Sequence, residues 1–223
     1  MPYRPVATIG VIVGMRSEAS LLAPGIPVGC SGGRPPEAAS IARALLEAGA
    51  DGLLSFGLAG GLLAGMAAGT LVIASAVELG GASLATDPTW SLRLANCLPS
   101  ARRGVVCGVT KPALTPADKA ALRGESGGLT VDMESGAVAE TCAGAGKPFA
   151  VLRAVADPAE RAIPAFALAG LGDDGRTRLW PVLFGLLRQP RSLPNLLGLA
   201  QDSSRALASL GAAARLLGPT LAF

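Results

Sequence analysis

Short apolar segments rich in β-branched residues recur along most of the chain, separated by stretches with helical or turn character. Such segments predict buried strands, because a strand covered on both faces needs no alternation of apolar and polar residues. The expected strands are Ala7–Val13, Leu53–Gly57, Thr70–Val77, Gly104–Val109, Leu129–Met133 and Phe149–Ala156.

Helical patterns alternate with these strands. Pro35–Ala48 begins at a proline pair and stops at Gly49, and Ser135–Ala145 stops at Gly146, as helices bounded by Pro and Gly do. Gly14–Leu22 predicts a loop that opens a helix.

The remaining segments are less regular. Gly29–Gly33 predicts a turn, and Gly80–Ser100 predicts an excursion over the surface. From Phe166 onward the pattern is helical, with expected interruptions at Pro181, Pro190 and Pro194.

Alternating strands and helices predict an α/β fold of three layers, with a central mixed, mostly parallel sheet covered by helices on both faces. We expect one domain over residues 1–223, with residues 166–223 as a helical C-terminal extension. Ligands of such folds collect at the carboxyl edge of the sheet. Glu18, the Gly57–Leu62 loop, Glu134 and Asp157 all fall at expected strand ends, which predicts a site there.

The stretch Gly52–Val77 contains no charged residue and is long enough to cross a bilayer. Glycines interrupt it, however, and Asp51 and Glu78 flank it without the basic or aromatic anchors of a membrane span. We therefore expect two buried strands joined by a glycine-rich loop.

Composition excludes several classes of function. A net charge of +3 and only two Trp, one Tyr and five Phe give no basic or stacking surface for nucleic acid. The absence of histidine excludes Ser-His-Asp and Cys-His catalysis and zinc sites of the HExxH kind. Four scattered cysteines and no visible secretory signal indicate reduced thiols in a cytoplasmic protein, with no metal or cofactor expected.

Acid–base chemistry must then fall to carboxylates, Lys, Tyr or Cys. Asp157 follows an apolar strand, where burial would raise its pKa and suit it to donate a proton. Capping of the next segment by Asp157, or of a helix by Glu134, is the simpler alternative. The Gly57–Leu62 loop could cradle an anion through its N–H groups, although tight packing explains its glycines equally well.

Four segments together resemble the purine nucleoside phosphorylase and nucleosidase superfamily, in the family's order. They are Ile9–Leu22 (IGVIVGMRSEASLL), Ser55–Leu62 (SFGLAGGL), Val131–Ala137 (VDMESGA) and Arg153–Asp157 (RAVAD). The resemblance implies a nucleoside phosphorylase-like fold, a homodimer or larger homo-oligomer, and cleavage of the N-glycosidic bond of a small-molecule purine nucleoside. A non-catalytic nucleoside-binding protein on the same fold is the alternative from another class.

The resemblance also implies roles for individual positions. Asp157 matches the acid that protonates the base, Glu134 the carboxylate that binds the ribose hydroxyls, and Met133 the residue against the sugar. Glu18 matches the carboxylate that activates water. The nucleophile loop would include Ala59 and Gly60, and the base would contact Val109, Thr110 and Lys111.

Two departures from the family pattern remove hydroxyl groups from this site. Leu58 and Ala156 stand where Ser or Thr is frequent, which leaves Asp157 with fewer expected partners. Inorganic phosphate as a co-substrate would need cations, and Arg16 and Arg34 lie beside glycine-bearing loops, although Arg34 could equally be a surface residue. A carboxylate at Glu18 suits water instead, so both nucleophiles stay open.

Within the superfamily the chain most resembles the hopanoid-associated phosphorylase branch. The resembling pieces are Cys30–Pro35 (CSGGRP), Ala85–Trp90 (ATDPTW), Asp157–Arg161 (DPAER) and Pro190–Leu199 (PRSLPNLLGL). This implies release of adenine from adenosylhopane in hopanoid side-chain biosynthesis. A salvage nucleosidase for methylthioadenosine or S-adenosylhomocysteine is the alternative.

A substrate with a lipid tail would need an apolar doorway. Leu179–Leu199 carries Trp180, Phe184 and many leucines, with Arg188 and Arg191 among them. Such a segment could contact the inner face of the membrane peripherally or line a lipid groove. The alternative is a helical pair packed on the sheet or on a second subunit.

Overall fold

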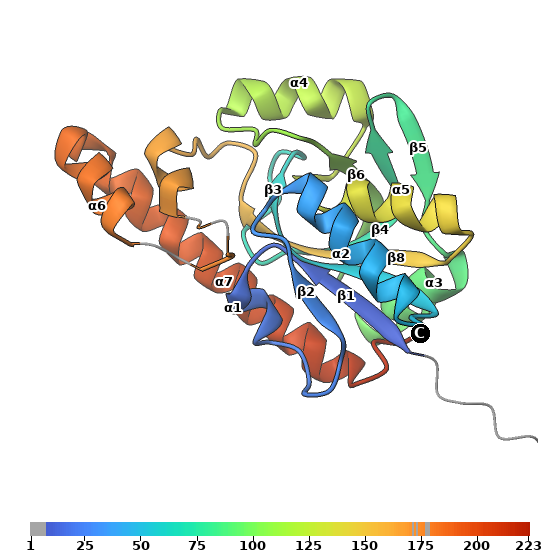
Figure 1. Cartoon of the computed structure of the whole chain (residues 1–223). Helices are drawn as coiled ribbons and strands as arrows, with labels where there is room; N and C mark the ends of the chain where they lie inside the picture. The colour runs from blue at the N-terminus through green and yellow to red at the C-terminus, as the bar shows by residue number, and fades with distance from the viewer. Residues whose placement is uncertain (1–7, 171, 173, 177–178) are drawn as a thin grey trace, which may run out of the picture.

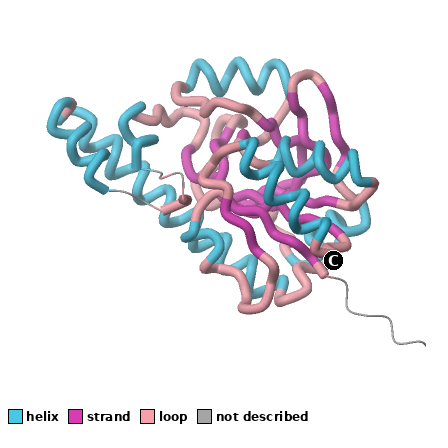
Figure 2. The backbone as a smooth tube through the Cα atoms, viewed as in Figure 1, coloured by secondary structure: helices cyan, strands magenta, loops and turns pink. Residues whose placement is uncertain are grey.

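The computed structural model describes residues 8–223 except 171, 173, 177 and 178. Within this part, eight strands form one mixed sheet in the order β2-β1-β3-β7-β6-β4-β5, and β8 pairs with both β3 and β4. Figure 2 shows the strands gathered in the middle of the molecule with helices around them. The strands are β1 (Ile9–Val13), β2 (Val28–Cys30), β3 (Gly52–Gly61), β4 (Leu71–Leu79), β5 (Ala82–Ala85), β6 (Arg102–Gly108), β7 (Thr130–Asp132) and β8 (Phe149–Asp157).

The double pairing of β8 closes part of the sheet on itself. β8 runs parallel to β3 and antiparallel to β4, while β7 and β6 connect β3 to β4 on the other side. These five strands therefore form a ring. At its end, Gly60 of β3 pairs with both Val131 of β7 and Asp157 of β8, which brings three chain segments together.

Helices cover both faces of the sheet (Figure 1). α2 and α5 pack together over one face, where a core of buried aliphatic side chains includes Ile12, Leu53 and Val138. α3 and α7 pack over the other, around Leu94, Leu152 and Leu210. The α/β architecture predicted by the alternating pattern is therefore confirmed. The helices are α1 (Arg16–Ala19), α2 (Pro35–Glu47), α3 (Pro88–Cys97), α4 (Pro116–Ser126), α5 (Ser135–Ala145), α6 (Leu179–Arg188) and α7 (Leu193–Leu217), with 3₁₀ helices η1 (Ala165–Gly170) and η2 (Pro190–Ser192).

The segment Gly80–Ser100 lies largely at the surface, as predicted, but it forms a strand and a helix rather than irregular chain. β5 returns antiparallel to β4 across a two-glycine turn, and α3 begins where Asp87 accepts a hydrogen bond from the backbone N–H of Trp90. The Trp90 ring is buried, and its Nε1 donates to the carbonyl of Leu221 at 2.8 Å. One aromatic side chain thus anchors to the core a segment whose local pattern is mostly polar and small.

Two other expectations are corrected, and one helix was not expected at all. The predicted turn Gly29–Gly33 includes the end of β2, which is completed by its parallel pairing with β1. The Gly57–Leu62 segment is strand to Gly61 rather than loop, because β7 and β8 flank it and satisfy its backbone groups. α4 was not predicted, although Thr115 and Asp118 cap it reciprocally.

The C-terminal segment is helical, as predicted, but only one of the three prolines expected to interrupt it separates two helices. Pro181 and Pro194 lie in the first turns of α6 and α7, where a missing N–H costs nothing. Pro190 begins the short η2 that separates the two helices. Figure 1 shows α6 and the first half of α7 projecting beyond the sheet.

The uncharged stretch Gly52–Val77 holds β3 and most of β4, so the expectation of two strands is confirmed. None of the helices that the structure describes is both long enough and apolar enough to span a bilayer.

Candidate active site

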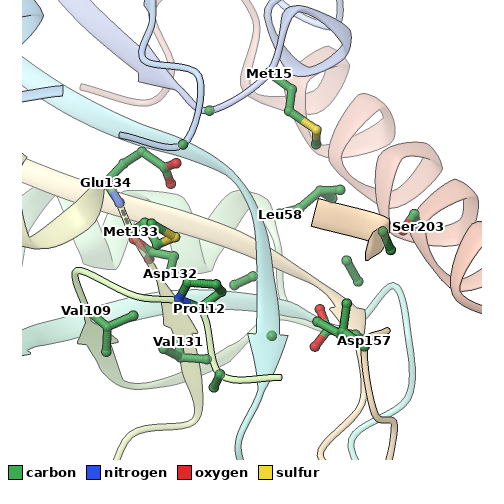
Figure 3. A pocket seen from close by; sticks show the side chains of 18 of the residues that line it. Met15, Leu58, Val109, Pro112, Val131, Asp132, Met133, Glu134, Asp157 and Ser203 are labelled. Carbon is green, nitrogen blue, oxygen red and sulfur yellow. Dashed lines mark hydrogen bonds between the residues drawn. The ribbon is translucent and has the colours of Figure 1, made fainter. Parts of the chain in front are cut away.

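A cavity of about 320 Å³ lies where β3, β7 and β8 end. Its walls come from the loop after β1, the last residues of these three strands, the start of α5, the segment after β6, and α7. In Figure 3, Glu134 and Asp157 stand on opposite sides of this cavity, with Met15 and Ser203 of α7 along its rim.

Glu134 is positioned by the junction of β7 and α5. Oδ1 of Asp132, at the end of β7, accepts the backbone N–H groups of Glu134 at 2.9 Å and Ser135 at 2.7 Å, which caps the helix start. Glu134 is itself buried, and this burial raises its pKa to about 8 against the lowering influence of Arg153. The cap therefore fixes a buried carboxyl at the cavity wall.

Arg153 of β8 is a fully buried cation behind this wall. Its Nε lies 2.8 Å from Oδ2 of Asp132, and its Nη2 lies 3.3 Å from Oε2 of Glu134 and donates to Oγ of Ser55 at 2.6 Å. Burial alone would lower the pKa of Arg153, but Asp132, Glu134 and Glu18 together raise it. The guanidinium therefore stays charged and fixes the orientation of the carboxylates.

Glu18 is the third buried carboxyl near Arg153, after Asp132 and Glu134. Its Oε2 accepts the backbone N–H groups of Gly14 and Met15, and its Oε1 accepts that of Leu58, each at 2.8 Å. Burial raises its pKa, although the bond from Leu58 and the charge of Arg153 oppose the shift. Glu18 is thus held rigidly, and burial makes its carboxylate a stronger base than an exposed glutamate.

Glycine at position 14 lets the two glutamates approach each other. A methyl group placed on Gly14 would lie 2.7 Å from Oε1 of Glu134 and 3.5 Å from Oε2 of Glu18. Both carboxyls therefore border the same small space at the end of β1.

Asp157 closes β8 on the far side of the cavity. Its Oδ2 lies 2.6 Å from Nζ of Lys119, a fully buried side chain of α4. Burial raises the pKa of Asp157, while Lys119 lowers it. Two kinds of carboxyl therefore face one cavity: a pair of glutamates around Arg153, and an aspartate paired with a lysine.

This arrangement suits a particular chemistry. A buried carboxyl with a raised pKa can protonate a leaving group, and the glutamates on the other side, in their ionised form, can stabilise positive charge on the substrate. Among the residues that the structure describes, no three Cys, Asp or Glu side chains group as metal ligands would.

Most of the predicted site residues line the cavity. They are Glu18, Ala59, Gly60, Val109, Met133, Glu134 and Asp157. Leu58 and Ala156, which replace expected hydroxyl residues, line it too and make it more apolar. Ala156 has no hydroxyl group to bind Asp157, and Lys119 is the partner of that carboxyl instead.

Four predicted residues lie outside the lining. Arg16 is held against another segment, since its Nε donates to the carbonyl of Asp174 at 3.0 Å. Arg34 begins α2 with a half-exposed side chain whose Nη2 lies 3.7 Å from Oε2 of Glu37. The remaining two, Thr110 and Lys111, are exposed and line a neighbouring hollow.

Thr110 and Lys111 lie outside the cavity because the chain turns after β6. Val109 donates its N–H to the carbonyl of Asp132 at 2.9 Å, and the chain then swings outward before returning. Pro112 and Ala113 therefore line the cavity in place of Thr110 and Lys111.

Sequence reasoning also missed several residues of the site. Arg153 offered a signal, because it is the single charged residue within the apolar strand that precedes Asp157. Asp132, two residues before Glu134, offered a weaker one. Lys119 and Ser203 offered none, since they reach the site from helices distant in sequence.

Comparison with known proteins places these features in a family context. The family model described as the phosphorylase superfamily matches residues 26–169. No curated protein matches the chain. Among solved structures, S-adenosylhomocysteine nucleosidase from Streptococcus pyogenes with 5-methylthiotubericidin has a TM-score of 0.64 at 21% identity, over 70% of this chain and 86% of that one.

Two further solved structures are similar. The 5'-methylthioadenosine/S-adenosylhomocysteine nucleosidase from Neisseria meningitidis with methylthio-immucillin-A has a TM-score of 0.65 at 19% identity, over 91% of this chain and 97% of that one. Futalosine hydrolase of Helicobacter pylori has a TM-score of 0.60 at 18% identity, over 69% and 89% respectively. At these identities the likeness is one of fold.

Proposed function

The chain belongs to the phosphorylase superfamily, and from that premise we propose that it cleaves the bond between a purine base and a ribose. The observation that carries this proposal is the placement of Asp157 and Glu134 on opposite sides of one cavity. A nucleoside between them would present its base to one carboxyl and its sugar to the other.

Asp157 acts as the general acid in this proposal. As the base departs, electrons of the broken bond move onto its rings, and a proton delivered to an imidazole-ring nitrogen neutralises them. Burial supports the role, because it raises the pKa of Asp157 and so favours the protonated form that an acid needs.

Glu134 holds the sugar, and Met133 packs beside it. A carboxyl that accepts the ribose hydroxyls fixes the ring. Its ionised form, which the charge of Arg153 favours, stabilises the positive charge that develops as the bond breaks. The charge of Arg153 and the cap from Asp132 hold Glu134 in place for that contact.

Water is the nucleophile that the cavity favours over phosphate. The three N–H groups that could cradle a phosphate near Gly14 and Leu58 are already bonded to Glu18. The two arginines expected to bind phosphate, Arg16 and Arg34, do not line the cavity. Glu18 would then accept a proton from the attacking water, which makes hydrolysis the proposed reaction.

Adenosylhopane is the proposed substrate, which makes the product a ribosyl hopane. Apolar residues from the C-terminal half, Ile163, Ala167 and Leu199, line the cavity and offer a path for a lipid tail. Methylthioadenosine or S-adenosylhomocysteine is the second candidate, and the names of the similar solved structures favour it.

The projecting helices would meet the tail or a membrane. Phe184 and Leu187 are exposed on α6, and Leu193 and Leu197 on α7. Cζ of Arg188 lies 4.2 Å from the ring centroid of Phe184. The side chain of Trp180, which also motivated this idea, lies outside the described residues. We propose that this surface contacts anionic lipid, and binding to phosphatidylglycerol vesicles tests it. A homo-oligomer that buries the same surface would abolish such binding and appear in light scattering.

The test of function is incubation with adenosylhopane and with methylthioadenosine, each with and without phosphate. Mass spectrometry of the sugar product identifies both the substrate and the nucleophile. Asp157→Asn should bind nucleoside without releasing base, whereas Glu140→Gln on the exposed side of α5 should behave as wild type. If the wild-type protein is folded and binds nucleosides but cleaves none of them, it is a carrier and the proposed function fails.

A further inference from the structure

Lys119 is a buried cation that the proposed chemistry has not yet used. Its side chain is fully buried in α4, an environment in which a lysine is costly unless its charge is paired and its N–H groups are bonded. Its Nζ meets Oδ2 of Asp157 at 2.6 Å and the carbonyl oxygens of Asp157, Pro158 and Arg161 at 3.3, 2.9 and 2.9 Å. All four acceptors belong to the end of β8 and the turn after it.

Two other charged groups influence Asp157. The negative charge of Asp202, in α7, raises the pKa of Asp157, and the positive charge of Arg161 lowers it. These two groups neutralise each other, since Nε of Arg161 lies 2.7 Å from Oδ2 of Asp202, which also pairs with Arg205. Among the described ion pairs, Lys119 is therefore the cation in direct contact with Asp157.

We propose that Lys119 is the positioning residue of the general acid: it binds one oxygen of Asp157, leaves the other for the base, and stabilises the carboxylate that forms. This inference rests on the proposed function. In the step concerned, the proton of Asp157 moves to a ring nitrogen of the purine. The electron pair of the broken C–N bond moves to the base, and a carboxylate remains beside the Lys119 ammonium.

The lysine resolves a conflict in the requirements of the acid. Burial favours the protonated form of Asp157, but it also disfavours the carboxylate that must form when the proton leaves. An ammonium at 2.6 Å lowers the free energy of that carboxylate and so strengthens the acid. The simpler alternative is that Lys119 only anchors the turn through its three carbonyl contacts.

Charge separates these two roles. Lys119→Gln keeps donors for the carbonyls and removes the charge, Lys119→Arg keeps the charge, and Lys147→Gln at an exposed position serves as the control. Because the acid must be protonated, the rate falls as pH rises through its pKa. Loss of the charge should raise that pKa, so Lys119→Gln should move the basic limb of the kcat/KM profile up by about one pH unit. Lys119→Arg and Lys147→Gln should leave the limb in place.

A second substrate provides an independent reading. A p-nitrophenyl riboside has a leaving group that needs no protonation. Lys119→Gln should lose about tenfold or more in kcat on a purine nucleoside and much less on the p-nitrophenyl riboside. Equal losses on both substrates, with an unmoved pH limb, would overturn the proposal and leave an anchoring lysine.

NMR titration separates failure of this inference from failure of the proposed function, because it needs no turnover. The ¹³C carboxyl signal of Asp157, assigned through Asp157→Asn, should titrate at a higher pH in Lys119→Gln than in wild type. If Lys119→Gln does not fold, the ¹⁵N ammonium signal of Lys119 in wild type should shift at the pH where Asp157 titrates. The proposal is overturned if the Asp157 carboxyl titrates at the same pH in Lys119→Gln and in wild type. It is also overturned if the Lys119 ammonium signal does not shift as Asp157 titrates. Both results can be obtained with an inactive protein.

Discussion

Oε1 of Glu18 accepts a hydrogen bond of 2.8 Å from the backbone N–H of Leu58, which ties the first helical turn to the far half of β3. The other oxygen of Glu18 takes the N–H groups of Gly14 and Met15. Three amides that could face a bound anion therefore face a carboxylate that is part of the protein. These amides are therefore not available to bind phosphate, which supports the proposed hydrolysis.

Glu18→Gln should abolish most of the proposed nucleosidase activity, because an amide cannot take a proton from water. We expect a loss of about a hundredfold or more in kcat, measured as release of base by liquid chromatography. Addition of phosphate should not restore the rate. Glu37→Gln at an exposed position of α2 is the matched control, and a phosphate-dependent rate in Glu18→Gln would contradict hydrolysis.

Gly57→Ala should disturb the same carboxylate from the other side. A methyl group there would lie 2.7 Å from Nη1 of Arg153 and 2.8 Å from Oε1 of Glu18, closer than real contacts allow. We expect a loss of about 1–3 kcal/mol in the free energy of unfolding, measured in urea, together with reduced activity.

The control for this change is Gly144→Ala. Gly144 lies in α5 with no atom within 4 Å of the added methyl group. Alanine there should stabilise the protein by about 0.5–1 kcal/mol, because glycine is a poor helix former. Equal effects of the two substitutions would show that the space beside Arg153 and Glu18 is not tight.

The sequence predicted those parts of the site that local pattern determines. Glu18, Glu134 and Asp157 each follow an apolar strand, and the carboxyl edge of a sheet brings such positions together. Their placement around one cavity could therefore be predicted without coordinates. Their catalytic roles remain predictions, which the experiments above address.

What the sequence could not predict depends on distant pairings. The ring closed by β8 gives Gly60 two partners, so a glycine-rich segment that looked like a loop continues as strand. Lys119 meets Asp157 because its long side chain reaches from α4 to the end of β8, and no local pattern marks that contact. Arg16 and Arg34 lay near the right loops, but the direction of a side chain is set by neighbours that sequence spacing does not reveal.

Arg153→Met should strongly lower the free energy of unfolding. It removes a buried cation from Asp132 and Glu134, which leaves two buried carboxyls without their partner. We expect a loss of about 3–5 kcal/mol in the free energy of unfolding. Asp132→Asn in the same background should cost much less than it does alone, and additive losses in this double-mutant cycle would show that the pair is not coupled.

Glu134→Gln should make the protein more stable at alkaline pH while removing activity. The folded-state pKa of Glu134, about 8, lies above its ordinary value of 4.5, so folding favours the protonated form. Its contribution to stability is fully present below pH 4.5 and is lost as pH rises toward 8. A glutamine cannot ionise, so the variant avoids this loss.

Urea unfolding at pH 5 and at pH 8 measures the effect. One pKa unit corresponds to about 1.4 kcal/mol, so the decline in stability between these pH values should be smaller in Glu134→Gln by more than about 1 kcal/mol. Some decline should persist, because burial also raises the pKa values of Glu18 and Asp157. Glu140→Gln on the exposed face of the same helix should keep the full wild-type decline. An identical pH dependence in wild type and Glu134→Gln would mean that Arg153 keeps Glu134 ionised throughout, and that this carboxylate meets the ribose already charged.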